Sequence, residues 1–124
     1  MQKTYLINGQ ELKPEANLRE LDFRGKTLRG VNLSRSDLKG ADFTCAMLYG
    51  AILRRANLEE SILQGAKLKG AKLDRANLKN ADLRGVDLRG ASLYETDIEG
   101  AKINGLFIDD NEGRSYKIID HRKY

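Results

Sequence analysis

The sequence predicts an all-β solenoid, a chain wound into coils with a corner every five residues. An apolar residue recurs at every fifth position from Leu18 to Ile108, at 19 positions without an exception. A small residue stands two positions earlier in nearly every unit, and only Leu21, Lys26 and Leu106 break this second column. Because large apolar and small side chains both favour the protein interior, the pattern predicts one narrow apolar core.

A period of five fits neither a helix nor a flat strand. On an α-helix, at about 100° per residue, successive leucines would advance by roughly 140° and spread round the whole surface. On a strand, which has a period of two, they would alternate between the two faces. The pattern therefore predicts short extended segments joined by corners, in coils that bury their edges by stacking on each other.

From residue 41 to residue 95 the chain reads ADFTC AMLYG AILRR ANLEE SILQG AKLKG AKLDR ANLKN ADLRG VDLRG ASLYE. Over residues 16–110 the sequence resembles the pentapeptide-repeat proteins, whose motif is commonly written A(D/N)LXX. The resemblance implies a right-handed quadrilateral β-helix with four pentapeptides in each coil. Residues 16–110 would then make about 4.75 coils.

The 124 residues are predicted to form one domain with a cap at each end. Residues 1–15 form the N-terminal cap, where the Asn8-Gly9 pair favours the tight turn of a hairpin. Residues 111–124 form a C-terminal cap and tail, and a second hairpin is expected over residues 106–119. Four apolar residues here are candidates for either a cap or a dimer interface, so monomer and homodimer both stay open: Leu106, Phe107, Ile118 and Ile119.

Residues 20 apart are expected to stack in columns along the solenoid. One core column serves packing and not ligand binding, and it consists of Phe23, Phe43, Leu63, Leu83 and Ile103. A column of Asn and Asp is expected to bond the neighbouring backbone, and it consists of Asn17, Asp37, Asn57, Asn77 and Asp97. Lys26 occupies an inward column, so we expect either a bulge or an edge position where its side chain reaches solvent. Glycines that end a pentapeptide are predicted to form the corners.

Two sets of outward residues are candidate interaction sites. Apolar side chains stand where polar ones would be usual, at Met47, Tyr49, Ile52 and Ile62. A corner column contains Arg35, Arg55 and Arg75 and ends at Glu95. An arginine column can bind phosphate or an acidic partner, and a solvated edge is the alternative.

No catalytic constellation is predicted. The one histidine, His121, lies in the tail, and Cys45 ends a pentapeptide at a corner without a histidine in the repeat. We therefore expect no enzyme activity, no cofactor and no metal. The lone cysteine excludes an internal disulfide, and the chain has no apolar run suited to a signal peptide or membrane span. A cytoplasmic protein without membrane contact is the expectation.

The function expected is that of a non-enzymatic scaffold that binds a protein. The first alternative comes from the resemblance, which implies that some relatives act on DNA gyrase by imitating duplex DNA. That role demands an acidic rod, whereas this chain has a net charge of +4. The second alternative is anion or nucleic-acid binding through the arginine column and through Lys67, Lys69 and Arg89.

Overall fold

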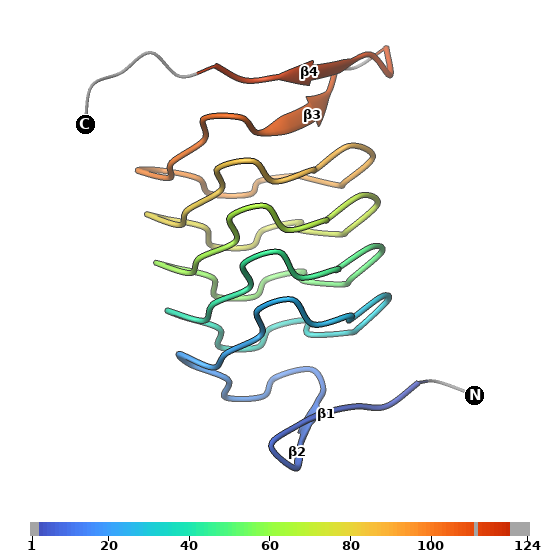
Figure 1. The fold of residues 1–124 in the computed structure, drawn as a ribbon, viewed down its shortest axis with the longest axis vertical. Coiled ribbons are helices and arrows are strands. Elements are labelled where there is room, and N and C mark those ends of the chain that lie inside the picture. Colours follow the sequence, from blue (N-terminus) through green and yellow to red (C-terminus); the bar gives the residue numbers. More distant parts are fainter. Residues whose placement is uncertain (1–2, 111, 120–124) are drawn as a thin grey trace.

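The computed structural model describes residues 3–110 and 112–119, and the chain winds into a stack of coils (Figure 1). Parallel backbone bridges join residues 20 apart, from Asn17–Asp37 near one end to Asp87–Phe107 near the other. This offset corresponds to four pentapeptides per coil. The count of about 4.75 coils and the right-handed sense stay predictions.

Hydrogen bonds between coils hold each pentapeptide in place. The N–H of Leu38 donates to the carbonyl of Asn57 in the next coil at 2.7 Å, and the N–H of Asp37 donates to Ala16 in the preceding coil at 2.9 Å. The N–H of Ala41 donates to the carbonyl of Leu38 at 3.0 Å and closes the corner. The backbone of an interior coil is therefore satisfied by the coils on both sides.

Each corner is made by a residue in the left-handed region. Where glycine stands there, φ lies between 65° at Gly25 and 79° at Gly105, which confirms the predicted role of these glycines. Residues with a Cβ adopt the same conformation at other corners, among them Arg35 (57°), Cys45 (58°) and Arg55 (58°). This conformation costs a non-glycine residue roughly 1–2 kcal/mol, so the surrounding ladder imposes it.

The Asn and Asp column bonds the backbone as predicted. The Oδ1 atom of Asn57 accepts the N–H of Glu59 at 3.2 Å, and Asn77 accepts the N–H of Lys79 at 3.0 Å. The amide groups also link the coils, because Asn77 donates from Nδ2 to Oδ1 of Asn57 at 3.4 Å. The column therefore stabilises both the corners and the stacking.

The core column begins with two stacked aromatic rings. Phe23 and Phe43 are fully buried, with ring centroids 4.5 Å apart and planes 5° apart. Leu63 and Leu83 continue the column at 1% exposure, and Ile103 at its end is half-buried.

Lys26 lies on the open edge of the first coil. Its side chain is exposed, and its carbonyl still accepts the N–H of Met47 at 2.8 Å in the regular ladder. Of the two expectations for this residue, the structure therefore shows the solvent edge and no bulge.

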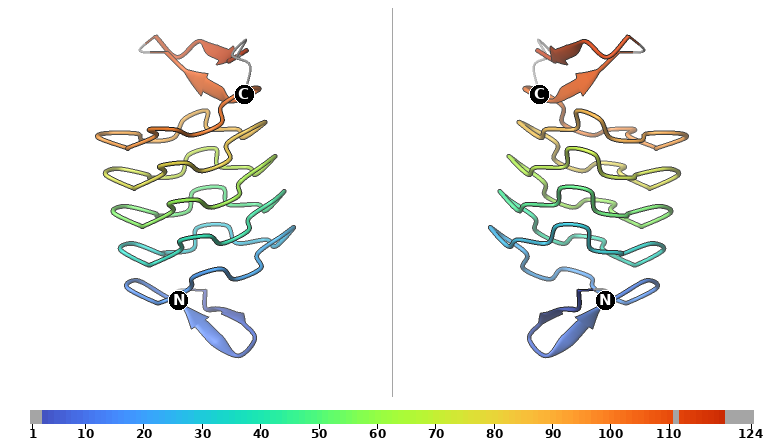
Figure 2. Two further views of the ribbon diagram at one scale, coloured as in Figure 1. Left: turned by 90° about the vertical axis from the view of Figure 1, so that its left-hand side faces the viewer. Right: turned by 90° about the vertical axis from the view of Figure 1, so that its right-hand side faces the viewer.

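A hairpin lies at each end of the stack (Figure 2). At the N-terminal end, β1 (Tyr5–Ile7) pairs antiparallel with β2 (Gln10–Leu12). At the C-terminal end, β3 (Phe107–Asp109) pairs antiparallel with β4 (Ser115–Lys117). His121 and the rest of the predicted tail, residues 120–124, lie outside the described residues.

Candidate interaction surface

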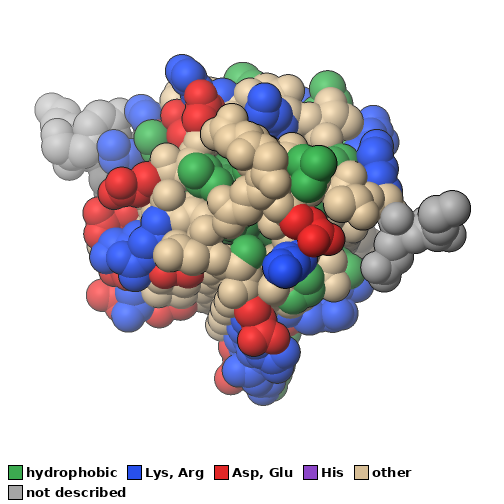
Figure 3. Space-filling model, turned by 90° about the horizontal axis from the view of Figure 1, so that it is seen from below, with side chains coloured by type: hydrophobic (Ala, Val, Ile, Leu, Met, Phe, Trp, Pro, Cys, Tyr) green, Lys and Arg blue, Asp and Glu red, His purple; other side chains and the backbone are tan. Residues whose placement is uncertain are grey.

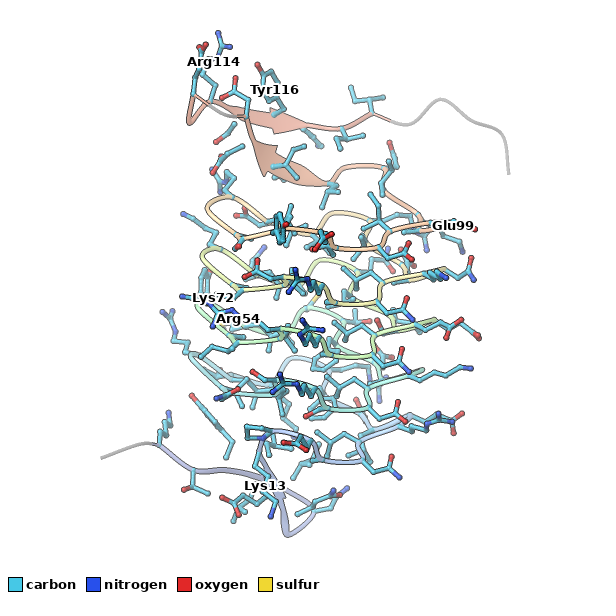
Figure 4. All side chains as sticks on the ribbon, turned by 180° about the vertical axis from the view of Figure 1, so that it is seen from behind. Lys13, Arg54, Lys72, Glu99, Arg114 and Tyr116 are labelled. Carbon is cyan, nitrogen blue, oxygen red and sulfur yellow. The ribbon has the colours of Figure 1, made fainter. Side chains whose placement is uncertain are left out.

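Basic and acidic residues are distributed unevenly between the faces of the stack. Two adjoining faces, here called the basic side, are formed by residues 27–35, 47–55, 67–75 and 87–95 and carry nine basic and three acidic residues. The other two faces, here called the acidic side, comprise residues 16–26, 36–46, 56–66, 76–86 and 96–106. They carry seven basic and nine acidic residues. In Figure 4, Arg54 and Lys72 project on one side of the stack and Glu99 on the other.

On the acidic side most cations are neutralised by a nearby carboxylate. The pairs are Arg19–Asp37 (2.5 Å), Arg24–Asp22 (2.9 Å), Lys39–Glu60 (3.9 Å), Lys79–Asp97 (3.6 Å) and Arg84–Asp82 (2.7 Å). Exposed pairs of this kind contribute little to stability, but they reduce the positive field on this side.

On the basic side more than half of the cations lack such a partner. Ion pairs join Arg54 to Asp74 (3.2 Å), Arg75 to Glu95 (2.8 Å) and Arg89 to Asp87 (2.7 Å). Within residues 3–110 and 112–119, no carboxylate lies at ion-pair distance from Arg29, Arg35, Arg55, Lys67, Lys69 or Lys72. The members of the predicted arginine column therefore differ: Arg75 forms an ion pair, whereas Arg35 and Arg55 form none with the described residues.

A local carboxylate–arginine fork lowers several pKa values. The side chain of Arg89 donates from Nε and Nη2 to the two oxygens of Asp87, at 2.9 and 2.7 Å, and this hydrogen bonding lowers the pKa of Asp87. The same fork from Arg24 lowers the pKa of Asp22 to about 2. These pairs were not predicted from the sequence. An Asp two residues before an Arg is the pattern that could have indicated them.

An apolar row crosses the basic side within one coil. Met47 is 38% exposed, and Tyr49 and Ile52 are half-buried. The guanidinium of Arg29 lies over the ring of Tyr49, 4.5 Å from its centroid. The structure therefore brings together three of the four apolar candidates.

The fourth candidate, Ile62, lies elsewhere. It is 38% exposed on the acidic side, where its backbone bridges Asp42 and Asp82. It is not part of the row that Met47, Tyr49 and Ile52 form.

Three lysines lie in the coil next to the apolar row. Backbone bridges join Met47 to Lys67 and Ile52 to Lys72, and Lys69 lies between these lysines in the chain. Sequence reasoning singled out Lys67 and Lys69 but not Lys72. The signal was present, since the 20-residue offset places Lys72 over Ile52.

The four apolar residues of the C-terminal segment differ in burial. Leu106 is 4% exposed, and Ile118 is half-buried against the core. Phe107 is half-buried, with Arg89 and Lys117 at 5.5 and 5.6 Å from its ring centroid. Ile119 is 66% exposed.

One open cavity of about 420 Å³ lies between the N-terminal hairpin and the corner at Gly30. Lys3, Tyr5, Lys13 and Arg29 contribute to its lining, and the Tyr5 hydroxyl donates to the carbonyl of Arg29 at 2.6 Å. Seen from this end, charged side chains project around the rim of the molecule (Figure 3).

Among the described residues no group of three His, Cys, Asp or Glu side chains could hold a metal ion. They also include no helix long and apolar enough to cross a membrane.

A family model described as pentapeptide repeats matches the chain in eight copies, over residues 16–55, 41–79, 51–90 and 71–105. A pentapeptide repeat protein from the thylakoid lumen of Arabidopsis thaliana is 33% identical, with a TM-score of 0.74 over 77% of this chain and 66% of that one. A pentapeptide repeat protein from Nostoc PCC 7120 is 34% identical, with a TM-score of 0.58 over 82% of this chain and 77% of that one. No curated protein sequence matches the chain.

HetL, a pentapeptide repeat protein involved in heterocyst differentiation regulation in Nostoc sp. strain PCC 7120, is 31% identical with a TM-score of 0.46. The match covers 82% of this chain and 50% of HetL. The chain thus spans slightly less than two thirds of the Arabidopsis protein and half of HetL.

Proposed function

Because the chain belongs to the pentapeptide-repeat family, we propose that it is a non-enzymatic scaffold whose side faces bind a protein partner. The observation that carries this proposal is the apolar row of Met47, Tyr49 and Ile52. Its members occupy outward positions in consecutive pentapeptides, where the repeat motif favours polar residues. Neighbouring apolar side chains that are partly exposed within a polar surround are typical of a contact surface.

The coil ladder supports a binding role because it fixes where these side chains point. The N–H of Met47 donates to Lys26 at 2.8 Å, and the N–H of Ile52 donates to Val31 at 2.8 Å. A surface held by backbone bonds on both sides loses little conformational entropy when a partner binds. The same rigidity favours recognition over catalysis, which generally needs a concave site with converging polar groups.

We propose that the C-terminal segment is a cap and not a dimer interface. Burial of Leu106 and partial burial of Phe107 and Ile118 within the same chain support this assignment. Of the four candidates, only Ile119 is largely exposed. A monomer is therefore the form proposed, and the free, exposed Cys45 is compatible with the cytoplasm.

Imitation of duplex DNA finds no comparable support. Such a mimic needs a continuous acidic surface, whereas the acidic side has only two more acidic than basic residues. Several of its carboxylates, such as Asp22 and Asp82, are also engaged by arginines. We therefore do not propose gyrase or another topoisomerase as the partner.

A photo-cross-linking experiment tests the proposal. The photoreactive residue p-benzoylphenylalanine is placed at Met47 or Ile52, and in control variants at Gln64 or Lys102 on the acidic side. In cells that make the protein, we expect a discrete protein adduct from the first pair and none from the control pair. Equal adducts from all four positions, or no protein adduct from Met47 and Ile52, would contradict a specific surface here.

A further inference from the structure

We propose that the partner presents an acidic polypeptide segment with apolar side chains, and that this segment binds across the corner between the two faces of the basic side. The proposal rests on the proposed function, because it names the chemistry of the partner for the same surface. It is carried by three observations, namely cations without carboxylate partners, an apolar row beside them, and a bare glycine ridge between the faces.

The first observation is the concentration of cations near the apolar row. Lys67, Lys69 and Lys72 lie one coil above it, and none has a carboxylate within ion-pair distance among the described residues. Arg55 follows in the same coil as the row and is likewise without an ion pair there. Since none of these groups forms an ion pair with a described carboxylate, a ligand with several carboxylates gains electrostatic complementarity.

The second observation is that the surface is not uniformly charged. Met47, Tyr49 and Ile52 form an apolar row one coil below the lysine row, and the coils lie about 4.8 Å apart. A fully ionic ligand would leave this row in contact with water. A segment that carries apolar side chains next to its carboxylates covers both rows, like an interface with an apolar centre and a polar rim.

The third observation is the shape of the corner. Gly30, Gly50 and Gly70 form a column between the two faces, and a Cβ added to any of them meets nothing within 4 Å. No side chain therefore separates Tyr49 from Ile52, or Lys69 from Lys72. An extended segment can cross this ridge and contact both faces.

The aromatic residues favour a polypeptide over a single-stranded nucleic acid. Nucleic-acid surfaces that bind single strands commonly use free aromatic faces for base stacking. Here Arg29 covers one face of Tyr49, which is itself half-buried. Tyr94 is 63% exposed, but it lies two coils from the apolar row and has Arg75 at 5.4 Å from its ring centroid. Phosphates alone would not use the apolar row either.

The test uses the full chain and a fluorescein-labelled dodecapeptide of Glu and Asp with two central leucines. A second peptide carries serines in place of the leucines, and a single-stranded DNA of 20 nucleotides is the nucleic-acid probe. Binding is followed by fluorescence anisotropy at 50 and 300 mM salt. We expect the leucine peptide to bind at least tenfold more tightly than the serine peptide, and to weaken with salt.

Two triple variants with the same change in net charge separate a local site from bulk charge. Lys67→Glu, Lys69→Glu and Lys72→Glu together should weaken leucine-peptide binding at least tenfold. Lys39→Glu, Lys79→Glu and Lys102→Glu on the acidic side should change it less than twofold. Circular dichroism melting verifies that both variants fold. If both triple variants weaken the peptide equally, or if DNA binds more tightly than the leucine peptide, the proposal is wrong.

The cross-linking experiment distinguishes this failure from failure of the proposed function. If the Met47 adduct persists in the Lys67, Lys69 and Lys72 triple variant, the surface binds a protein but the acidic chemistry is wrong. If the adduct is lost together with peptide binding, the acidic segment is supported. If the wild-type chain gives neither an adduct nor peptide binding, both proposals are wrong.

Discussion

The two ends of the stack are closed to different degrees. At the N-terminal end, Ile7 and Leu12 of the hairpin are 7% and 6% exposed, and Leu18 in the first coil is fully buried. At the C-terminal end, Leu93 and Ile98 are 38% and 46% exposed although they stand at inward positions of the repeat, as Leu18 does. An inward position is therefore buried only where another element covers it, which the repeat itself does not supply at an end.

The C-terminal hairpin covers only part of the last coil. Its backbone joins the coil through Gly105, whose N–H donates to Ile118 at 2.7 Å, and through Leu106, whose carbonyl accepts the N–H of Ile118 at 2.8 Å. For Leu93 and Ile98, no backbone acceptor of the N–H groups occurs in the described part of the chain. The comparison predicts that similar truncations of inward side chains will have unequal effects in the interior and at the two ends of the stack.

The largest effect is expected in the interior, from Phe43→Ala. The side chain is fully buried and stacks on Phe23, so truncation leaves a cavity between two coils. We expect a loss of about 3–5 kcal/mol in the free energy of unfolding. Urea denaturation followed by circular dichroism measures this, and a loss below 1 kcal/mol would contradict a packed column.

A matched pair of substitutions at the two ends compares the caps directly. Leu12→Ala removes a side chain buried under the N-terminal hairpin and should cost about 2–4 kcal/mol. Ile98→Ala removes a side chain already half in water and should cost less than about 1 kcal/mol. Equal losses in urea denaturation would mean that the C-terminal end is covered as well as the N-terminal end.

A smaller effect is expected from two serines in the column of small residues. Ser36 donates its hydroxyl to the carbonyl of Lys13 at 3.1 Å and so ties the N-terminal cap to the stack. Ser61 is 1% exposed, and its hydroxyl has no hydrogen-bond partner among the described residues. Ser61→Ala should therefore raise the free energy of unfolding by about 1 kcal/mol, whereas Ser36→Ala should lower it by a similar amount. Changes of the same sign would overturn this interpretation.

The smallest effect is local and depends on pH. Asp110 accepts the backbone N–H and the Nε–H of Arg114, at 2.8 and 2.7 Å, and these bonds lower the pKa of Asp110 below its usual range. A lowered pKa in the folded state gives stability above pH 4, and this stability is lost as the pH falls through the folded pKa. The N-terminal turn, Asn8-Gly9, has no ionisable side chain.

Acid should therefore loosen β3 and β4 before β1 and β2. Amide exchange measured by NMR between pH 5 and pH 2.5, corrected for the intrinsic effect of pH, should show loss of protection in the C-terminal hairpin first. In the Asp110→Asn variant this difference between the hairpins should disappear. Simultaneous loosening of both hairpins in the wild-type chain would count against a role for Asp110.

Much of this architecture could be predicted from the sequence because each coil repeats the same local chemistry. The column of glycines at corners such as Gly25 and the bonding of Asn57 and Asn77 follow from conformational preferences within one pentapeptide. Exposure of Ile98 could not be predicted, since its repeat unit looks like any other and the difference lies in what covers it.

The candidate surface was only partly predictable for a related reason. Met47, Tyr49 and Ile52 were recognisable because they depart from the repeat motif. Whether a cation is neutralised depends on the reach of side chains between coils, as with Arg75, which pairs with Glu95, and Arg55, which does not pair among the described residues. The 20-residue period gives the neighbours of a residue but not the rotamers that decide the pairing.

The central claim is that backbone hydrogen bonds between coils hold the columns in place, and that this ladder of bonds ends at the last coil. Native-state hydrogen exchange tests it most directly. The amides of Leu33 and Leu38 donate to the next coil at 2.8 and 2.7 Å and should exchange about a thousandfold or more slowly than unstructured amides. The amides of Leu93 and Ile98 should exchange within tenfold of the unprotected rate. Comparable protection at the four sites would contradict an open C-terminal coil, and fast exchange at Leu33 and Leu38 would contradict the ladder itself.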